Sequence, residues 1–256
     1  MTDPLLAEFE SQGFCIVPAT DLDTLDGLRD STRQLAYDII GAAPGHSVGE
    51  DLDRLHEHVD PGEPATRFRR ELTRAMSEVL DVGRDVFTAF EAQLTDLVGY
   101  DVLVQRVPNL VFQPPGDPQP TELHRDAPAN SPYEVVVWLP LVDCSRTKSM
   151  YLLDRSASDE VLAFHRTHPD DATGFQRLLD ARAVLMEVPY GSALLFWPGL
   201  FHGSLVNRES DSRLSLNIRY KNLFAPLGMK DPFRYFAVMR TSPLTRLGLA
   251  FERREG

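Results

Sequence analysis

The sequence contains few cysteines and no long uninterrupted hydrophobic run. Its 256 residues include only Cys15 and Cys144, which argues against a disulfide scaffold, and no CxxC pair offers a zinc site. No stretch approaches the roughly eighteen consecutive apolar residues of a membrane-spanning helix. The N-terminal segment carries acidic residues where a signal peptide would carry basic ones. We therefore expect a cytoplasmic protein with reduced, buried thiols.

Positive charge is also scarce. The chain has 26 Lys and Arg against 38 Asp and Glu, a net charge of −12. This balance argues against nucleic acid or an anionic membrane as the main partner, because both are themselves negative. A neutral or cationic small molecule fits the charge better, and the oligomeric state stays open.

The first part of the chain has a helical pattern. Phe14 to Ala19 reads as a short strand, and Thr20 or Asp21 can cap the helix that follows. A loop rich in Gly, Pro and acidic residues is expected over 41–64. Beyond it, hydrophobic residues recur at helical spacing from Phe68 to Leu97, which predicts one long amphipathic helix that Gly99 closes.

From Tyr100 the pattern changes to short β-type runs separated by Pro and Gly. We predict strands in these runs: DVLVQRV, NLVFQ, YEVVVWLPL, SMYLL, AVLMEV, SALLFW and RLSLNIRY. A helical insertion over 156–182 interrupts them. Helices first and strands afterwards predict an α+β fold or a helix-supported β-barrel. We expect a single domain over 1–256, with helical support over 1–99, a β-rich core over 100–224 and a tail over 225–256.

The segment TELHRDAP holds a candidate metal site. In an extended segment, His124 and Asp126 point the same way and Arg125 points away. Alone, such an HxD pair is more often a capped turn than a metal site. A second histidine, His202, follows an apolar strand and a Pro-Gly turn. Two histidines and one carboxylate form the facial triad of non-haem Fe(II) oxygenases, which leaves coordination positions open for other ligands.

Arg213 lies eleven residues after His202, at the start of a strand with informative alternation. One face carries Leu214, Leu216, Ile218 and Tyr220, and the other carries Arg213, Ser215, Asn217 and Arg219. A guanidinium beside a hydroxyl suits one end of a dicarboxylate such as 2-oxoglutarate. The alternative for Arg213 is a surface ion pair with Asp211 or Glu209.

His124, Asp126, His202 and Arg213, in this order and spacing, resemble the Fe(II)/2-oxoglutarate dioxygenases of the phytanoyl-CoA dioxygenase-like branch. The resemblance implies a double-stranded β-helix (jelly-roll, cupin-like) core with supporting N-terminal helices. It also implies Fe(II) as cofactor and 2-oxoglutarate and dioxygen as cosubstrates. The three triad residues would bind the metal and Arg213 would bind the far carboxylate of 2-oxoglutarate. Hydroxylation, desaturation and oxidative ring closure all remain open.

The same resemblance assigns weaker roles to further residues. Ser204 and Ser215 match cosubstrate-binding hydroxyls, and Gln105 and Asn109 match a Gln/Asn pair on an early barrel strand. The chain departs from the branch where a PGSH-like stretch is usual, because it has SMYLLDRSAS there, so the branch does not assign the substrate. Candidate substrate contacts are Arg125, Trp138 and Arg219.

VVVWLPLVDC, SMYLLD and the segment around His202 are more similar to the subset of these oxygenases found in bacterial carbohydrate and aminoglycoside biosynthesis. We therefore expect a small polar, neutral or cationic, sugar-like substrate. The alternatives are the same chemistry on an acyl-thioester, amino-acid or lipid substrate, and a non-enzymatic cupin-like binding protein.

Two rival histidine groupings could hold a metal. His56 and His58 could join Asp60, but they lie in an acid-rich stretch without a strand pattern, which favours a solvated loop. His165 and His168 could share one helix face, but no nearby acidic motif completes a zinc site.

Overall fold

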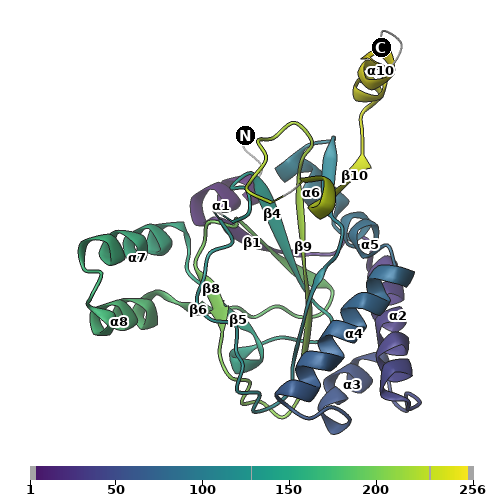
Figure 1. Ribbon diagram of the computed structural model, residues 1–256, viewed down its shortest axis with the longest axis vertical. Helices are drawn as coiled ribbons and strands as arrows, with labels where there is room; N and C mark the ends of the chain where they lie inside the picture. Colours follow the sequence, from purple (N-terminus) through teal and green to yellow (C-terminus); the bar gives the residue numbers. More distant parts are fainter. Residues whose placement is uncertain (1–3, 128, 231, 253–256) are drawn as a thin grey trace.

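The structure is a computed structural model that describes residues 4–127, 129–230 and 232–252. A helical part with one strand comes first (Figure 1). Its elements are α1 (Pro4–Gln12), β1 (Phe14–Pro18), α2 (Leu22–Ile40), α3 (Val48–Asp53), η1 (Leu55–Glu57), α4 (Glu63–Val79), α5 (Val82–Ala89) and α6 (Glu91–Val98).

A strand-rich part follows. Its strands are β2 (Val102–Gln105), β3 (Asn109–Gln113), β4 (Glu134–Pro140), β5 (Met150–Leu152), β6 (Val184–Leu185), β7 (Ser192–Phe196), β8 (His202–Ser204), β9 (Arg213–Asn222) and β10 (Phe236–Arg240). The helical segments within and after it are η2 (Arg146–Lys148), α7 (Arg155–Thr167), α8 (Ala172–Arg182), α9 (Pro232–Tyr235) and α10 (Pro243–Glu252).

The strands form two antiparallel sheets. A seven-stranded sheet has the order β1-β7-β4-β9-β2-β10, and β3 also pairs with β9, so that β2 and β3 lie end to end along one edge of β9. A three-stranded sheet has the order β6-β5-β8. Side chains from both sheets line one pocket between them. The α+β fold with a jelly-roll core is therefore confirmed.

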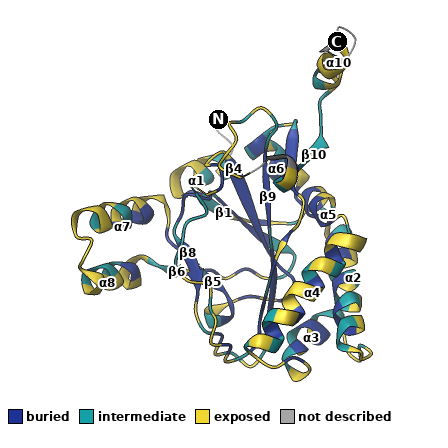
Figure 2. Cartoon of the chain, in the orientation of Figure 1, coloured by how far each residue is buried: buried dark blue, intermediate teal, exposed yellow. Residues whose placement is uncertain are grey.

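The N-terminal helices cover the outer face of the larger sheet. α4 packs on β3, and α2 packs on α4 and α5 (Figure 1). Aromatic pairs connect the two layers: Phe68 of α4 meets Phe112 of β3 edge-on at 5.0 Å between ring centroids, and Phe87 of α5 lies 5.7 Å from Tyr220 of β9. Figure 2 shows β9 buried along its length. Its predicted apolar face packs against helices, which leaves its polar face for the pocket.

The prediction of one long helix from Phe68 to Leu97 is wrong, because the chain forms α4, α5 and α6 in its place. Leu80 is extended, with φ −111° and ψ 146°, and the side chain of Asp81 accepts a hydrogen bond from the backbone nitrogen of Arg84. An aspartate in this position favours the start of a new helix, because its carboxylate accepts a hydrogen bond from a backbone N–H of the first turn. In a continuous helix that N–H would bond to a backbone carbonyl instead.

Two other expectations need correction. The loop over 41–64 contains α3 and η1, and α3 begins with a Ser47–Glu50 capping box that is visible in the sequence. The segment 225–256, expected as a tail, contributes β10, which pairs with β2 as an outer strand of the larger sheet. The predicted insertion is present as α7 and α8, whose small apolar cluster is separate from the main core.

Among the residues that the structure describes, no helix is both long enough and apolar enough to cross a membrane.

Gly83 allows α5 to approach the sheet closely. The hydroxyl of Tyr220 donates a hydrogen bond to the Gly83 carbonyl at 2.7 Å, and a Cβ atom on Gly83 would lie 2.7 Å from Cγ2 of Val104. Because valine is stiff at χ1, a methyl group here would force the helix away from the sheet.

We predict that Gly83→Ala lowers the free energy of unfolding by about 1–3 kcal/mol, because overpacking outweighs the better helix propensity of alanine. Gly27→Ala in α2 is the matched control, since no atom lies within 4 Å of its added Cβ. The control should be neutral or slightly stabilising. Urea unfolding of both variants measures the effect, and equal stabilities would contradict this account of the contact.

Candidate active site

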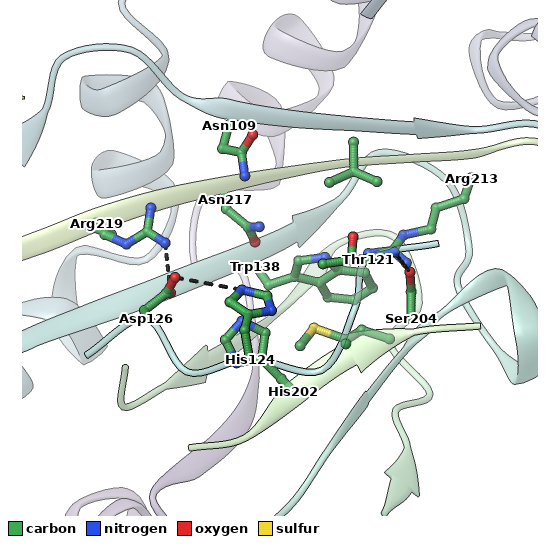
Figure 3. A pocket seen from close by; sticks show the side chains of 13 residues that line it. Asn109, Thr121, His124, Asp126, Trp138, His202, Ser204, Arg213, Asn217 and Arg219 are labelled. Atoms are coloured by element: carbon green, nitrogen blue, oxygen red, sulfur yellow. Dashed lines mark hydrogen bonds and ion pairs between the residues drawn. The ribbon is translucent and has the colours of Figure 1, made fainter. Parts of the chain in front are cut away.

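A pocket lies between the two sheets, and both contribute to its walls (Figure 3). One row of residues crosses the larger sheet: Trp138 of β4 pairs in register with Asn217 of β9, which pairs with Asn109 of β3. The smaller sheet supplies Met150 and Ser204. The full lining is Asn109, Val111, Thr121, His124, Asp126, Trp138, Met150, His202, Gly203, Ser204, Arg213, Asn217 and Arg219.

His124 and His202 lie side by side at one end of the pocket. Their backbones form a reciprocal bridge, in which each amide donates to the other carbonyl at 3.0 Å, and their rings are 4.2 Å apart. In each ring Nδ1 is within hydrogen-bond distance of a backbone carbonyl, 2.8 Å from Glu122 for His124 and 3.0 Å from Leu200 for His202. Nδ1 must donate in such a contact, which leaves the lone pair of Nε2 for a metal.

Burial keeps His202 neutral. The residue is only 6% exposed, and desolvation lowers the pKa of its imidazole to about 4. A neutral imidazole is the form that coordinates a metal ion, so no proton has to leave His202 at neutral pH before a metal binds.

Asp126 completes the group and is held by Arg219. Its Oδ1 lies 3.8 Å from Nε2 of His124, and its Oδ2 accepts a hydrogen bond from Nη2 of Arg219 at 2.6 Å. Burial raises the pKa of the Asp126 carboxyl, but the Arg219 guanidinium and the two histidines together outweigh it and hold that pKa below its usual value. The other terminal nitrogen of Arg219 donates to Gln105 at 3.1 Å and to the hydroxyl of Tyr235 at 3.2 Å.

The donor set fits a metal ion. One potential ligand atom from each of His124, Asp126 and His202 lies within 4.8 Å of the other two. Among the described residues, no other three His, Cys, Asp or Glu side chains come together in this way. Two imidazole nitrogens and one carboxylate oxygen match the facial arrangement of non-haem iron enzymes. The HxD alternative of a plain capped turn leaves this convergence of three side chains unexplained.

The histidines of the two rival groupings make other contacts. His56 contacts the Ser212 hydroxyl at 3.1 Å, and His58 packs edge-on against Tyr37. His168 stacks on Phe164, and His165 meets Phe175. Within the described residues, neither grouping gathers three metal-ligating side chains.

Arg213 lies at the far end of the pocket and is a buried cation. It is 3% exposed, and it donates from Nη1 to the Ser149 carbonyl at 3.2 Å and from Nε to Ser215 at 3.3 Å. Burial lowers the pKa of its guanidinium. No carboxylate of the described residues pairs with it. The alternative partners are engaged elsewhere, because Asp211 pairs with Lys148 at 3.3 Å and Glu209 accepts from Thr147 at 2.7 Å.

A buried guanidinium without an anionic partner is costly unless a ligand supplies the anion. Two further polar atoms of the pocket residues also lack partners in the described structure: Nε1 of Trp138, whose ring centroid lies 5.2 Å from the Arg213 guanidinium, and Oδ1 of Asn217. Arg213, Asn217 and Trp138 all line the pocket. Arg213 and the Trp138 N–H suit an acidic ligand in the space between Arg213 and the histidines, whereas Asn217 Oδ1 suits a donor group.

The remaining predicted residues differ in their placement. Ser204 lines the pocket and accepts a hydrogen bond from the Thr121 amide at 2.8 Å, and Asn109 also faces the pocket. Ser215 and Gln105 do not line it. Ser215 orients Arg213, and Gln105 supports Arg219 instead of facing a cosubstrate.

Of the expected substrate contacts, Trp138 is fully buried in the pocket wall and Arg219 is committed to Asp126. Arg125 points away from the triad, with its guanidinium 5.0 Å above the Phe201 ring. Asn217, Thr121 and Met150 also line the pocket, although no role was predicted for them. For Asn217 the signal was available, since it lies on the polar face of the β9 pattern.

The jelly-roll fold and the His-Asp-His pocket define a class, the non-haem iron, 2-oxoglutarate-dependent oxygenases. The family model described as phytanoyl-CoA dioxygenase (PhyH) matches residues 9–215. The chain belongs to this family. A comparison with curated proteins finds no match.

Solved structures of such oxygenases share the fold. EctD from S. alaskensis, with 2-oxoglutarate and 5-hydroxyectoine, has a TM-score of 0.57 and 16% identity, covering 95% of this chain and 85% of its own. The 2-oxoglutarate-dependent carbocyclase SnoK from nogalamycin biosynthesis has a TM-score of 0.55 and 14% identity, covering 91% and 89%. HygX from Streptomyces hygroscopicus, with nickel and 2-oxoglutarate, has a TM-score of 0.52 and 14% identity, covering 88% of each chain. At these identities the similarity shows the fold alone.

Proposed function

We propose that His124, Asp126 and His202 bind Fe(II), and that the enzyme oxidises a C–H bond of a small polar natural product. The observation that carries the proposal is the convergence of two imidazoles, each fixed at Nδ1 by a backbone carbonyl, with a carboxylate fixed by Arg219. Such outer contacts are typical of metal ligands, because they set the tautomer and the direction of each donor atom.

The iron and its cosubstrates supply the oxidising chemistry, in which 2-oxoglutarate is decarboxylated to succinate while the substrate is oxidised. The residues of this chain bind and orient. Arg213 would bind the far carboxylate of 2-oxoglutarate, with Ser215 aligning its guanidinium and Ser204 close by in the pocket wall. Trp138 and Met150, both buried, would exclude water from the same space.

Arg219 would act on the metal through Asp126. It occupies Oδ2 and so leaves Oδ1 as the oxygen that faces His124. A carboxylate held in this way would offer a single oxygen to the metal beside the two histidines. Gln105 and Tyr235 fix the direction of Arg219 in turn.

For the substrate, we infer a carbohydrate or aminoglycoside intermediate, oxidised by hydroxylation or by oxidative ring closure. The net charge of −12 favours a neutral or cationic molecule. A structural neighbour, SnoK, comes from nogalamycin biosynthesis, which favours a natural-product substrate. The alternative is the same chemistry on an acyl-thioester, amino-acid or lipid substrate, which the acyl-CoA in the family's own description favours. A cytoplasmic location fits the two free, buried thiols Cys15 and Cys144.

The first test is metal binding and turnover. We predict that His124→Ala and His202→Ala each abolish both Co(II) binding, followed by its visible spectrum, and succinate formation with Fe(II). Arg219→Met should weaken metal binding by about 10–100-fold, as loss of an outer contact to a ligand typically does.

Arg240→Met is the matched control for Arg219→Met. Arg240 also pairs with a carboxylate, that of Glu91 at 2.7 Å, but it does not line the pocket, so its loss should leave metal binding unchanged. Full turnover in both histidine variants would refute the triad.

The second test concerns Arg213. We predict that Arg213→Met raises KM for 2-oxoglutarate by roughly 10–150-fold, since a hydrogen bond to a charged group contributes about 1.5–3 kcal/mol. Co(II) binding should be unchanged. Succinate formation at varied 2-oxoglutarate concentration measures KM. If the chain is instead a non-enzymatic cupin-like binding protein, the wild-type protein should form no succinate and Arg213→Met should leave ligand affinity unchanged.

The third test concerns substrate class. We predict that amino sugars or aminoglycosides stimulate succinate formation from 2-oxoglutarate, and that acyl-CoA thioesters of comparable concentration do not. A substrate that occupies the pocket couples cosubstrate turnover to its own oxidation, so mass spectrometry should find the oxidised sugar. Stimulation by an acyl-CoA alone would contradict the carbohydrate assignment and support the alternative.

A further inference from the structure

The C-terminal segment exposes an unusual amount of apolar surface. Among the residues that the structure describes, eight of the seventeen exposed large hydrophobic side chains lie between Phe224 and Phe251. Scattered exposed hydrophobic residues are ordinary, but a group concentrated in one segment indicates a surface that a partner covers.

The helix α10 carries much of this surface on one face. Leu244, Leu247 and Phe251 follow at spacings of three and four, and they are 79%, 70% and 63% exposed. Gly248 lies between them, and a Cβ there would meet no atom within 4 Å. Figures 1 and 2 show α10 standing away from the rest of the molecule, with its surface largely exposed.

The start of α10 is nevertheless fixed. The Ser242 amide donates to the Asp101 carboxylate, and the Ser242 hydroxyl accepts from the Thr245 amide at 3.1 Å as a helix cap. An isolated ten-residue helix is marginal in water, so an anchored and capped helix with a bare apolar face needs a surface to pack on. We call Pro243–Glu252 the arm.

An apolar groove beside α1 and α6 offers such a surface. Two adjoining hollows share Phe9 and Trp197, and one of them is also lined by Leu97, Pro132 and Tyr133. Tyr133 is 57% exposed although it is a large aromatic residue. An amphipathic helix with anchors at i, i+3 and i+7 suits a groove of this kind.

Charge selects the occupant. From Lys221 to the C-terminus the chain has seven Lys and Arg against three Asp and Glu, whereas residues 1–220 have nineteen against thirty-five. In the arm, Arg246 contacts the Thr241 carbonyl and no carboxylate of the described residues. On α1, beside the groove, the carboxylates of Glu8 and Glu10 form no ion pair within the described structure. Arg246 of the arm, in a C-terminal segment that is basic as a whole, therefore complements the acidic residues of α1 on a second copy.

We propose that the arm of one copy binds the α1–α6 groove of a second copy, and that the exchange is reciprocal. A two-fold axis makes both contacts identical, as expected for a homodimer. Leu244, Leu247 and Phe251 enter the groove, and Arg246 lies over the acidic end of α1. The proposal is independent of the iron site, because none of these residues lines that pocket.

The test measures the mass of the full-length protein by light scattering after size exclusion, over a range of concentrations. The wild-type protein is expected at twice the 28.8 kDa of one chain. Leu247→Glu with Phe251→Glu changes the arm, and Tyr133→Arg changes the groove. Each should reduce the mass to that of one chain, while Co(II) binding stays as in the wild type and reports an intact fold.

Val184→Glu is the matched control, because Val184 is 56% exposed on β6 but lies in the other sheet, outside the groove and the arm. This variant should remain a dimer. A wild-type protein that is monomeric at every concentration would overturn the proposal. So would an arm variant that stays dimeric, and a groove variant that stays dimeric would remove the α1–α6 groove as the docking site.

Discussion

The reciprocal backbone bridge between His124 and His202 is the contact on which the site depends. It attaches the segment before β4 to β8 by two hydrogen bonds of 3.0 Å, and so joins residues that are far apart in sequence. The side-chain period of an extended strand is two, so a slip of one residue would turn an imidazole out of the pocket. The two Nδ1 contacts act in the same sense, because each ring is fixed by a carbonyl two residues before it.

Buried charges divide the pocket into two unlike ends. At the triad, Asp126 and Arg219 neutralise each other, and the pair is further satisfied by Gln105 and Tyr235. At the other end Arg213 has only neutral acceptors. Breaking a buried ion pair is strongly destabilising, whereas a buried cation that awaits an anion stores binding energy for it. The first end is therefore already neutralised, whereas the second offers an unpaired positive charge to the proposed dicarboxylate.

Much of this arrangement could be predicted from sequence, for a physical reason. Side chains along a strand point alternately to its two faces. In β9 this alternation of polar and apolar residues distinguished the pocket face from the helix-facing side in the sequence itself. The helix break at Leu80 and Asp81 was missed because hydrophobic residues keep their helical spacing through it. Asp81 was the available signal, since aspartate is a common helix N-cap. Strands β8 and β10 were missed because their pairing is set by distant partners, which propensity does not encode. The support that Gln105 gives to Arg219 spans more than a hundred residues and has no local signal.

The net charge of the chain describes its outside and not its pocket. Although the sequence is acidic overall, the charged residues of the lining, apart from the histidines, are Asp126, Arg213 and Arg219. Inside a partly closed site of low dielectric, these nearby charges outweigh distant surface carboxylates, which solvent and salt screen. The pocket is therefore suited to an anionic cosubstrate in a protein whose surface favours a neutral or cationic substrate. Basic and acidic residues are also separated along the chain, between the C-terminal segment and the rest of the molecule. In the proposed dimer, the basic segment of one copy would face acidic residues of the other, and the charged residues of the pocket would not take part.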